Sequence, residues 1–587
     1  MGPQGPRSLR LSVTFLLLNL TFLVAAPRMY SQTTNNGAAD IGPRNPGTVA
    51  AVTDCPVANP VKFPPSVSST PNCVDMSQPP STSPQPAAAG AGNVVGAGPL
   101  TGMWFESINV FEAVASVQGG AVSGGVPTEP IVGLGPAFNS NSCFSCHSAP
   151  TVGGSSPGSV TINGTVFNMP LSFGTSTLPT NPEITAASDQ GGTNSLPIFP
   201  SGSSFSGPGF TTVLPDGPVI EVRVIAGGGS GGFVVQPNSV AELFTIQGRT
   251  DASGCTLAQF PFSSLGSQSI AFRIPTPTFG LGLVEATPDA TLVANLAINN
   301  TSIAANAAAL GIAGSFNRNG NDGTITRFGW KAQNKSLMIF AGEASNVEMG
   351  VTNELFPNEK TVASGSTCPT NTAPAGDQPE DEILPQTFST VPAAANVASI
   401  VSSNSQNNAV FMRMNGAPSQ CDAKTLLTTD PYGTTGPAQC PAFTNLIVLG
   451  GQSLFDNQKA IGCSLCHNPT LISGLSQNSS LSNQTYHPYS DFALHHMGAG
   501  DADGVTQGLA GGDQFRTAPL WGLGQRIFFM HDGRAADLAT AIADHCPPAS
   551  QTAGGGFPVG EACASVTLFN GLPKAEQQDI LDFLRSL

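Results

Sequence analysis

Charged residues are scarce in this chain. Asp, Glu, Lys and Arg make up 10% of its 587 residues, and 37 acidic residues outnumber 21 basic ones. The formal net charge of −16 excludes nucleic acid and anionic membranes as expected partners, because both are polyanions. A cationic or neutral partner is expected instead.

Long hydrophobic runs are also missing, except at the N-terminus. The residues from Leu11 to Ala26 form an apolar run of sixteen, which follows Arg7 and Arg10 and is closed by small residues. This run is short for a membrane span, so we expect residues 1–32 to be a cleaved secretory signal rather than an uncleaved anchor. The sequence thus predicts a periplasmic or secreted bacterial protein with no stable membrane span after cleavage.

Much of the chain is expected to be loop rather than helix, because it contains 67 glycines and 50 prolines. Composition predicts a disordered Pro/Ser/Gly-rich segment at 33–98 and a linker or insertion at 361–440. Short runs of Val, Ile and Phe indicate short strands in a Gly/Ser-rich insertion at about 148–270. Helical spacing of apolar residues predicts mainly α domains at 99–360, which includes that insertion, and at 441–587.

Two C-x-x-C-H motifs carry the most specific chemical signal. They consist of Cys143, Cys146 and His147 in the first motif, and of Cys463, Cys466 and His467 in the second. A zinc site needs four ligands, and the other cysteines form no second pairs of this kind. A redox C-x-x-C motif would lie near a βαβ pattern, which the sequence does not contain. Covalent c-type haem uses two such thiols and the following imidazole as iron ligand, so we predict two haem c groups.

The other eight cysteines are expected to form disulfides, because the protein is predicted to be exported. Their positions suggest four pairs: Cys55–Cys73, Cys421–Cys440, Cys546–Cys563 and the long-range pair Cys255–Cys368.

Histidine is scarce, and none of the seven lies between His147 and His467. The sixth iron position of the first haem is therefore a methionine, a group from the C-terminal half of the chain, or empty. Met169, Met338 and Met349 are the methionine candidates. An open position is typical of O₂ or peroxide chemistry, whereas a fully ligated haem usually carries electrons.

The second haem has several candidates for its distal ligand. His545 ends a predicted helix and lies 78 residues after His467, a plausible distance in a cytochrome c-like fold. Met497 and Met530 are alternatives, although methionine more often fills a core than binds a metal.

Five segments resemble one protein family: RFGWKA, VEMGVT, YSDFALHHMG, FRTAPLWGLG and FFMHDGRAADLATAIADH. They are similar to segments of the bacterial di-haem oxidoreductases, labelled as peroxidases or thiol oxidoreductases and distantly related to the di-haem cytochrome c peroxidases. The resemblance is dense over about 325–355 and 441–587, sparse around the first motif and absent before about 100. It implies a mainly α fold of two facing cytochrome c-like haem domains, with long Gly/Ser-rich insertions that contain short strands.

The resemblance also implies roles for single residues. His545 lies fourteen residues after His531, where the peroxidases carry their distal ligand, which implies a bis-His second haem and a structural His531. Trp330 corresponds to a tryptophan between the haems and is the candidate electron relay, with ordinary core packing as the alternative. Phe340 stands where the peroxidases have a glutamine near the active haem. Glu348 corresponds to the active-site glutamate, a group that can transfer the peroxide proton.

Other matches are less specific. Glu285 is the alternative to Glu348. His495 stands where the family has a histidine before its Asp-Met-Gly, and His496 replaces that aspartate. Arg516 and Arg534 are candidates to bind haem propionates, with structural salt bridges as the alternative. Related peroxidases hold a calcium ion between the haems, but no acidic cluster supports calcium here.

The function favoured by these residues is reduction of hydrogen peroxide, or a similar oxidant, at the N-terminal haem. A small cytochrome or copper protein would supply electrons through the C-terminal haem. One alternative is an oxygenase that binds O₂, as the rubber-cleaving di-haem oxygenases do, and Phe340 favours it. The other alternative is an electron-transfer cytochrome without catalysis.

Overall fold

The structure is a computed structural model that describes part of the chain: short stretches between residues 107 and 256, residues 270–353, 355–357, 368 and 403–416, and nearly all of 445–587. The predicted signal at 1–32, the predicted disordered segment at 33–98 and most of 361–440 lie outside the described residues. Every described residue belongs to one compact unit, Ala39–Leu587. Among the helices of this described part, none is long and apolar enough to cross a bilayer.

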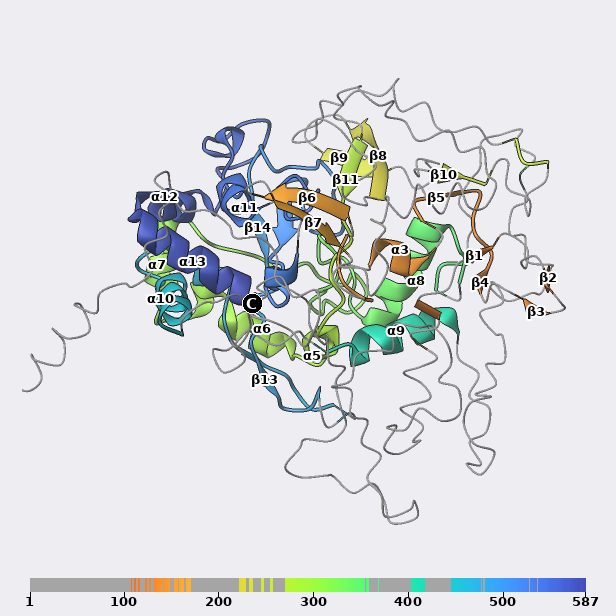
Figure 1. Cartoon of the computed structure of the whole chain (residues 1–587), viewed down its shortest axis with the longest axis horizontal. Coiled ribbons are helices and arrows are strands. Elements are labelled where there is room, and N and C mark those ends of the chain that lie inside the picture. The colour runs from red at the N-terminus through yellow and green to blue at the C-terminus, as the bar shows by residue number, and fades with distance from the viewer. Residues whose placement is uncertain are drawn as a thin grey trace, which may run out of the picture. The chain divides into compact units, whose positions relative to one another are not determined.

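The described chain is mainly helical with short strands, as predicted (Figure 1). The helices are α3 (Cys143–Cys146), α5 (Leu281–Glu285), α6 (Asp289–Asn295), α7 (Ala304–Leu310), α8 (Leu337–Met349), α9 (Asn404–Met414), α10 (Asn445–Phe455), α11 (Leu538–Asp544), α12 (Cys563–Gly571) and α13 (Lys574–Ser586). The strands are β1 (Ala115–Ser116), β2 (Val122–Ser123), β3 (Val126–Pro127), β4 (Ile131–Val132), β5 (Ala137–Phe138), β6 (Gly158–Ile162), β7 (Thr165–Met169), β8 (Glu221–Gly228), β9 (Gly232–Val235), β10 (Phe244–Thr245), β11 (Ile270–Arg273), β12 (Leu471–Ile472), β13 (Thr485–Tyr486), β14 (Leu494–His496) and β15 (Gln514–Arg516).

The strands form small separate sheets. Strands β6 and β7 make an antiparallel pair, and β8 pairs with both β9 and β11 in a three-stranded sheet. These elements confirm short strands within the insertion predicted at about 148–270. Strand β14 pairs with β15, with His495 opposite Phe515, and brings two segments of the C-terminal part together.

Helices α8 and α9 lie against each other, and serine side chains cap both of them (Figure 1). The Ser336 hydroxyl accepts from the N–H of Ile339, and the Ser403 hydroxyl accepts from the N–H of Gln406. Each such cap contributes roughly 1 kcal/mol. Helix α8 ends at Gly350, whose φ of 68° lies in the left-handed region that favours glycine.

The segment that leads into the first motif runs past the C-terminal end of α8. Gly135 and Gly350 are so close that a Cβ atom on Gly135 would lie 2.7 Å from the Cα atom of Gly350. The N–H of Gly135 donates to the carbonyl oxygen of Met349 at 2.9 Å, and the N–H of Asn139 donates to that of Glu348 at 2.7 Å. These contacts hold the first motif beside the end of α8.

Helices α10 and α13 also pack closely (Figure 1). A Cβ atom on Gly451 would lie 1.9 Å from the main-chain oxygen of Asp579, so only glycine permits this approach. The rings of Phe455 on α10 and Phe583 on α13 have centroids 5.5 Å apart. The ring of Phe455 also lies 6.2 Å from that of His467, so this helix pair backs the second motif.

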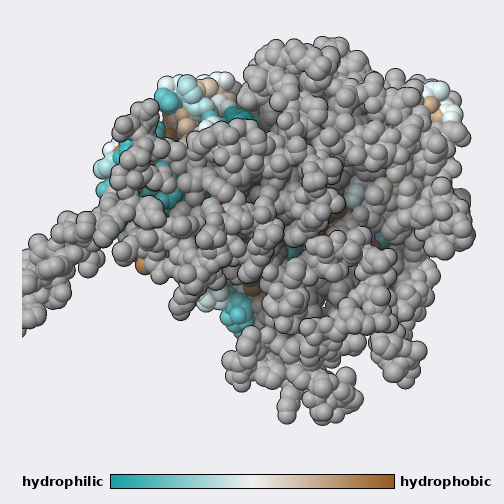
Figure 2. All heavy atoms as spheres, viewed as in Figure 1, coloured by the Kyte–Doolittle hydropathy of each residue, from teal (hydrophilic) through white to brown (hydrophobic). Residues whose placement is uncertain are grey.

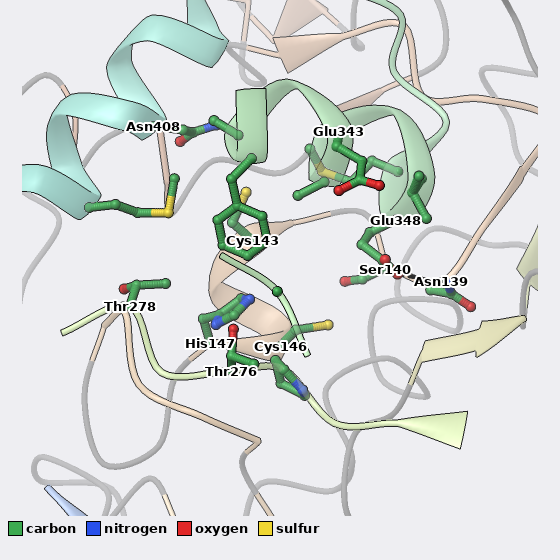
Figure 3. A pocket seen from close by; sticks show the side chains of 18 of the residues that line it. Asn139, Ser140, Cys143, Cys146, His147, Thr276, Thr278, Glu343, Glu348 and Asn408 are labelled. Atoms are coloured by element: carbon green, nitrogen blue, oxygen red, sulfur yellow. Dashed lines mark hydrogen bonds between the residues drawn. The ribbon is translucent and has the colours of Figure 1, made fainter. Parts of the chain in front are cut away.

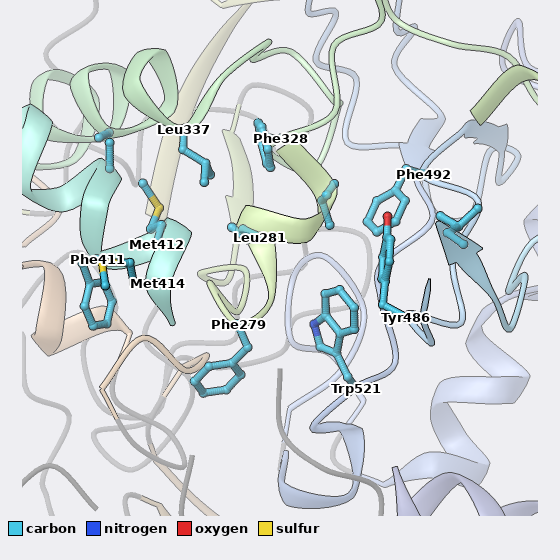
Figure 4. Packing of buried hydrophobic residues seen from close by; sticks show 14 of the residues in the cluster. Phe279, Leu281, Phe328, Leu337, Phe411, Met412, Met414, Tyr486, Phe492 and Trp521 are labelled. Carbon is cyan, nitrogen blue, oxygen red and sulfur yellow. The ribbon is translucent and has the colours of Figure 1, made fainter. Parts of the chain in front are cut away.

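One hydrophobic core joins residues of the two predicted domains (Figure 4). Phe279 and Phe411 lie in it with Tyr486 and Trp521 of the C-terminal part, and all four side chains are buried. Burying a large apolar side chain contributes roughly 1.5–3 kcal/mol. The two predicted domains are therefore packed on a common core, while their boundaries stay a prediction.

Two of the four predicted disulfides are confirmed: Cys255–Cys368 and Cys546–Cys563. The other two predicted pairs lie outside the described residues. The four cysteines of the C-x-x-C-H motifs are in no disulfide.

Hydrophilic and hydrophobic residues are interspersed where the described surface is visible in Figure 2. Leu475 and Leu509, 87% and 66% exposed, are the most exposed large apolar side chains of the described chain. Scattered apolar residues of this kind are ordinary and identify no binding surface.

Candidate functional site

The first C-x-x-C-H motif forms the short helix α3 and the residue after it. The N–H of His147 donates to the carbonyl oxygen of Cys143 at 2.9 Å. The imidazole Nδ1 of His147 donates to the carbonyl oxygen of Gly154 at 3.1 Å, which puts the ring's lone pair on Nε2. Burial raises the pKa of the Cys143 thiol to about 12 and so disfavours the thiolate that zinc or redox chemistry needs.

A pocket, called pocket 1 below, is lined by residues of α3, α8 and α9 (Figure 3). Its space, including open solvent at its mouth, is about 1010 Å³. The residues predicted for the first haem and for catalysis all line it: Cys143, Cys146, His147, Trp330, Phe340 and Glu348.

Glu348 lies near the end of α8 and is held by the segment before the first motif. Its carboxylate Oε2 accepts from the side-chain Nδ2 of Asn139 at 2.8 Å. Its alternative, Glu285, is elsewhere: it accepts from the N–H of Leu337 at 2.8 Å and pairs with the guanidinium of Arg413, and it is not among the residues that line pocket 1.

Among the polar residues that line pocket 1 and that sequence reasoning missed are Gln333, Glu343 and Asn408. Figure 3 labels Glu343 and Asn408. The Glu343 carboxylate accepts from Gln333 Nε2 at 3.2 Å and from the side-chain nitrogen of Asn334. A carboxylate only accepts, so the nitrogen of Gln333 must face it and the orientation of that amide is fixed. The amide oxygens Gln333 Oε1 and Asn408 Oδ1 are buried and have no hydrogen-bond partner among the described residues.

The three methionine candidates for the first haem lie in different parts of the structure. Met349 lines pocket 1, as does Met412, which the sequence did not suggest. Met338 packs against the core cluster, and Met169 ends strand β7. Pocket 1 thus holds two thioethers, one of them predicted.

A second and larger pocket, pocket 2, surrounds the second motif. Its space, including solvent at its mouth, is about 1450 Å³. It brings together all but one of the residues predicted for the second haem: Cys463, Cys466, His467, His545 and Arg516. Burial raises the pKa of the Cys463 thiol to about 12, as at Cys143.

His467 and His545 face each other in pocket 2. Each ring donates from Nδ1 to a main-chain oxygen, His467 to Tyr489 at 2.9 Å and His545 to Ala541 at 2.7 Å. Their ring centroids are 6.4 Å apart, close to the roughly 6 Å expected for a metal held by two imidazoles at about 2.0–2.1 Å each. Burial lowers the pKa of His467 to about 4 and also lowers that of His545, so both rings are neutral, as ligation requires.

The residue that accepts the bond from His467 has an unusual backbone conformation. Tyr489 has a φ of 50°, in the left-handed region that residues other than glycine rarely adopt. Its carbonyl oxygen receives the bond from His467. A strained residue that orients a functional side chain is typical of binding sites.

Three other side chains near the second motif were candidates because they carry an imidazole or a thioether: His495, Met497 and Met530. Both nitrogens of His495 are bonded to carboxylates, Nε2 to Asp491 at 3.0 Å and Nδ1 to Glu561 at 2.8 Å, which makes it a poor iron ligand. Met497 and Met530 line pocket 2, but His545 is the residue whose ring faces His467. In the described part of the chain, no group of three or more His, Cys, Asp or Glu side chains could hold a further metal ion.

The two arginines predicted to bind propionates differ in their surroundings. Arg516 lines pocket 2, donates from Nε to the carbonyl oxygen of Gly329 at 3.0 Å, and has a buried Nη1 without a partner among the described residues. Such an orphaned donor fits a carboxylate-bearing ligand. Arg534 is instead paired with Asp532 and, at 3.2 Å, with Asp501, and it is not among the residues that line pocket 2.

Trp330 lines both pockets. Its indole Nε1 donates to the carbonyl oxygen of Ile274 at 2.8 Å, and the N–H of Ile274 donates to the carbonyl oxygen of His531 at 2.8 Å. The ring of His531 lies 6.4 Å from that of Trp330 and stacks on Phe515 at 4.2 Å. His531 is thus a packing residue that also lines pocket 2.

Comparison with solved structures finds a match to hydrazine synthase of Kuenenia stuttgartiensis, in a crystal pressurised with xenon. It is 16% identical, covers 32% of this chain and 57% of that chain, and has a TM-score of 0.18, so it carries no structural argument. No curated protein matches the chain.

A family profile described as "Di-haem oxidoreductase, putative peroxidase" matches residues 263–425 and 435–587, more than half of the chain. The first range includes residues that line both pockets, the second includes residues that line pocket 2, and the first C-x-x-C-H motif lies before both. The facing imidazoles and orphaned guanidinium of pocket 2 fit a haem. The chain therefore belongs to the di-haem oxidoreductase family and is a haem-binding oxidoreductase.

Proposed function

We propose that this protein is a periplasmic di-haem c-type oxidoreductase that reduces hydrogen peroxide, or a similar oxidant, in pocket 1. The electrons pass through pocket 2, and each pocket belongs to a cytochrome c-like domain. The residues that hold the haems are Cys143, Cys146 and His147 in pocket 1, and Cys463, Cys466, His467 and His545 in pocket 2.

The proposed reaction balances with two electrons from outside the protein. One oxygen–oxygen bond breaks, and one peroxide, two electrons and two protons give two water molecules. A haem held by Cys143, Cys146 and His147 would supply the redox-active iron for this chemistry. The chain's own residues bind the peroxide, move its proton and connect the two pockets. A small cytochrome or copper protein is the electron donor, and the net charge of −16 favours a cationic one.

The observation that carries the proposal is the polar lining of pocket 1. Two buried acceptors of this lining, Gln333 Oε1 and Asn408 Oδ1, have no hydrogen-bond partner among the described residues, and two carboxylates, Glu343 and Glu348, lie in the same lining. Hydrogen peroxide has two O–H donors to satisfy such atoms, whereas O₂ has none. Each buried acceptor left unsatisfied costs roughly 1–3 kcal/mol, so this lining favours peroxide over O₂.

Glu348 is the proposed proton carrier. Its carboxylate takes the proton of one peroxide oxygen and delivers a proton to the other as the bond breaks, which is general acid–base work. The bond from Asn139 holds the carboxylate in place. Main-chain bonds from Asn139 and Ser140 to the carbonyl oxygen of Glu348 fix the end of α8 against the first motif.

Trp330 is the proposed path for electrons between the pockets. Its indole lies in the lining of both, and its bond to Ile274 holds it in one orientation. The contact between its ring and that of His531 extends this path toward pocket 2.

Two other functions have an observation in their favour. Phe340 lines pocket 1 and stacks on Phe328 at 6.2 Å, and this apolar wall favours an oxygenase that binds O₂. Met349 and Met412 also line pocket 1. A methionine bound at the sixth position of the iron would favour a pure electron carrier.

A turnover assay separates the three functions. Purified di-haem protein is mixed with a reduced small cytochrome and with hydrogen peroxide, and the oxidation of the cytochrome and the uptake of O₂ are both followed. Peroxide-dependent oxidation without O₂ uptake supports the proposal. O₂ uptake with an oxidisable hydrocarbon but no peroxide turnover supports the oxygenase, and neither activity supports the carrier.

A further inference from the structure

Pocket 2 contains a second buried guanidinium that the sequence did not single out. Arg526 follows the turn at Leu523–Gln525 and lines pocket 2, and it is 6% exposed, the same fraction as Arg516. Its Nε has no hydrogen-bond partner among the described residues, and neither has Nη1 of Arg516. One pocket therefore holds two buried cations, each with an unused donor.

Within the described residues, no protein anion compensates the charge of Arg516 or of Arg526. Burial lowers the pKa of Arg516 and of Arg526 to about 10, and no acidic side chain opposes this effect at either residue. Another cation is near instead, because Arg526 and Arg585 lie 5.8 Å and 5.4 Å from the ring centroid of Phe529. A buried charge is costly unless it is paired, so the guanidinium groups of Arg516 and Arg526 require anions that the described chain does not supply.

The acidic residues that line pocket 2 are paired with groups other than Arg516 and Arg526. Asp501 is paired through Oδ1 with Arg534 at 3.2 Å, while its Oδ2 has no hydrogen-bond partner among the described residues. Glu561 accepts from His495 Nδ1 at 2.8 Å and from the N–H groups of Ala313 and Gly314 at 2.9 and 3.1 Å. Neither carboxylate forms an ion pair with Arg516 or Arg526 in the described structure.

We propose that Arg526 is a carboxylate anchor of the haem in pocket 2, which binds one of its two propionates while Arg516 binds the other. Arginine suits this role because its planar donors match a carboxylate in geometry and stay charged when buried. The same geometry makes Arg534 unsuitable, since its guanidinium is paired with Asp501 and Asp532.

The proposed anchor also affects the redox chemistry of pocket 2. A buried positive charge disfavours oxidation of the iron, which would add another positive charge nearby. Two such arginines raise the potential of a haem whose two imidazole ligands would otherwise keep it low. Arg526 thus positions the haem of pocket 2 and raises its potential. It takes no part in the reaction in pocket 1.

The test is the midpoint potential of each haem in the intact di-haem protein, measured by redox titration followed by absorbance at several pH values. The variants are Arg526→Gln, which removes the charge, and Arg526→Lys, which keeps it without the planar donors. Arg318→Gln is the matched control, because Arg318 is exposed and donates to the carbonyl oxygen of Gly323.

We expect Arg526→Gln to lower the potential of the pocket-2 haem and to make it depend on pH near neutrality, because a propionate without its arginine titrates there. Arg526→Lys should show a smaller shift in the same direction, and Arg318→Gln none. An unchanged potential and pH profile in Arg526→Gln overturns the inference. If that variant does not fold, the same criterion applied to Arg526→Lys decides.

The inference rests on the haem proposed for pocket 2, and the two can fail separately. Wild-type protein without a low-spin haem bound by two imidazoles contradicts the proposed pocket-2 ligation. A normal signal of that kind with an unshifted potential in the Arg526 variants contradicts only the anchor.

Discussion

The rings of His467 and His545 face each other with centroids 6.4 Å apart, and each Nδ1 is bonded to a main-chain oxygen. The two residues are 78 positions apart in the chain, yet their Nε2 lone pairs are available to one pocket. The acceptor of the His467 bond, Tyr489, has a φ of 50°, and His545 caps the C-terminal end of helix α11.

Replacing His545 tests that pairing. His545→Met should raise the midpoint potential of the pocket-2 haem, because thioether ligation favours ferrous iron more than imidazole does. The potential is read by redox titration. Met530→Leu, a change in the same pocket, is the control and should leave the potential as it is. An unaltered potential and spectrum in His545→Met would exclude His545 as a ligand.

Removing the acid–base group should slow peroxide reduction without loss of haem. Glu348→Gln should lower kcat/KM for peroxide by a factor of roughly 10²–10⁴, the usual contribution of such a group. Steady-state kinetics measure it, and the absorbance of both haems should be unchanged. Asp322→Asn is the control, because Asp322 pairs with Lys335 at the surface. Full activity in Glu348→Gln together with an inactive Glu343→Gln would move the proton transfer to Glu343.

Trp330, which is partly buried, and Trp521, which is buried, allow a comparison of electron transfer. Trp330→Phe should slow the reduction of the pocket-1 haem by the pocket-2 haem, whereas Trp521→Phe, in the core and outside both pocket linings, should leave that rate unchanged. Stopped-flow absorbance after rapid reduction follows both haems. Equal rates in the two variants would show that Trp330 is only a packing residue.

The disulfide Cys546–Cys563 should contribute to stability and to the position of His545, which precedes Cys546 directly. Replacing both cysteines with serine should lower the free energy of unfolding by about 3 kcal/mol, as expected for a loop of this length. Denaturant titration of the haem protein measures this. A loss well below 1 kcal/mol, with an intact pocket-2 spectrum, would contradict the structural role given to this bond.

Acid should weaken the protein partly through Glu561. Burial is the largest single effect and would raise its pKa, but the hydrogen bond and charge of His495 and the N–H groups of Ala313 and His496 together outweigh it and hold the pKa at about 2. A carboxyl group with a lowered pKa stabilises the fold above its unfolded pKa of about 4.3, and that contribution is lost as pH falls toward 2. Glu561→Gln should therefore destabilise the protein by on the order of 3 kcal/mol at pH 7 and by little near pH 2. A difference from wild type that stays constant from pH 7 to pH 3 would show that this carboxyl group does not control acid stability.

Local patterns in the sequence predicted much of the two pockets. The C-x-x-C-H motifs identified both cysteine pairs and their histidines. The segments that resemble the di-haem oxidoreductases led to Trp330, Glu348 and His545. Each of these lies in a stretch whose own residues carry a recognisable pattern. The short strands of the insertion were likewise predicted from local apolar runs.

The missed residues depend on contacts between distant segments. Asn408 and Met412 lie on α9, which reaches pocket 1 from beyond residue 400, and no pattern in that helix points to the first motif. The bonds that place the first motif beside α8 are main-chain bonds, which leave no side-chain signature. Gln333 and Arg526 became evident only as orphaned buried atoms, and burial of a single atom cannot be inferred from sequence.

The central claim is one open iron in pocket 1 beside one iron held by His467 and His545 in pocket 2. An EPR spectrum of the oxidised di-haem protein, repeated after half-reduction, tests it most directly. The account predicts a high-spin ferric signal, or one that appears on half-reduction, together with one low-spin signal typical of two imidazole ligands. Two low-spin signals in both states would contradict it and would make the protein an electron carrier.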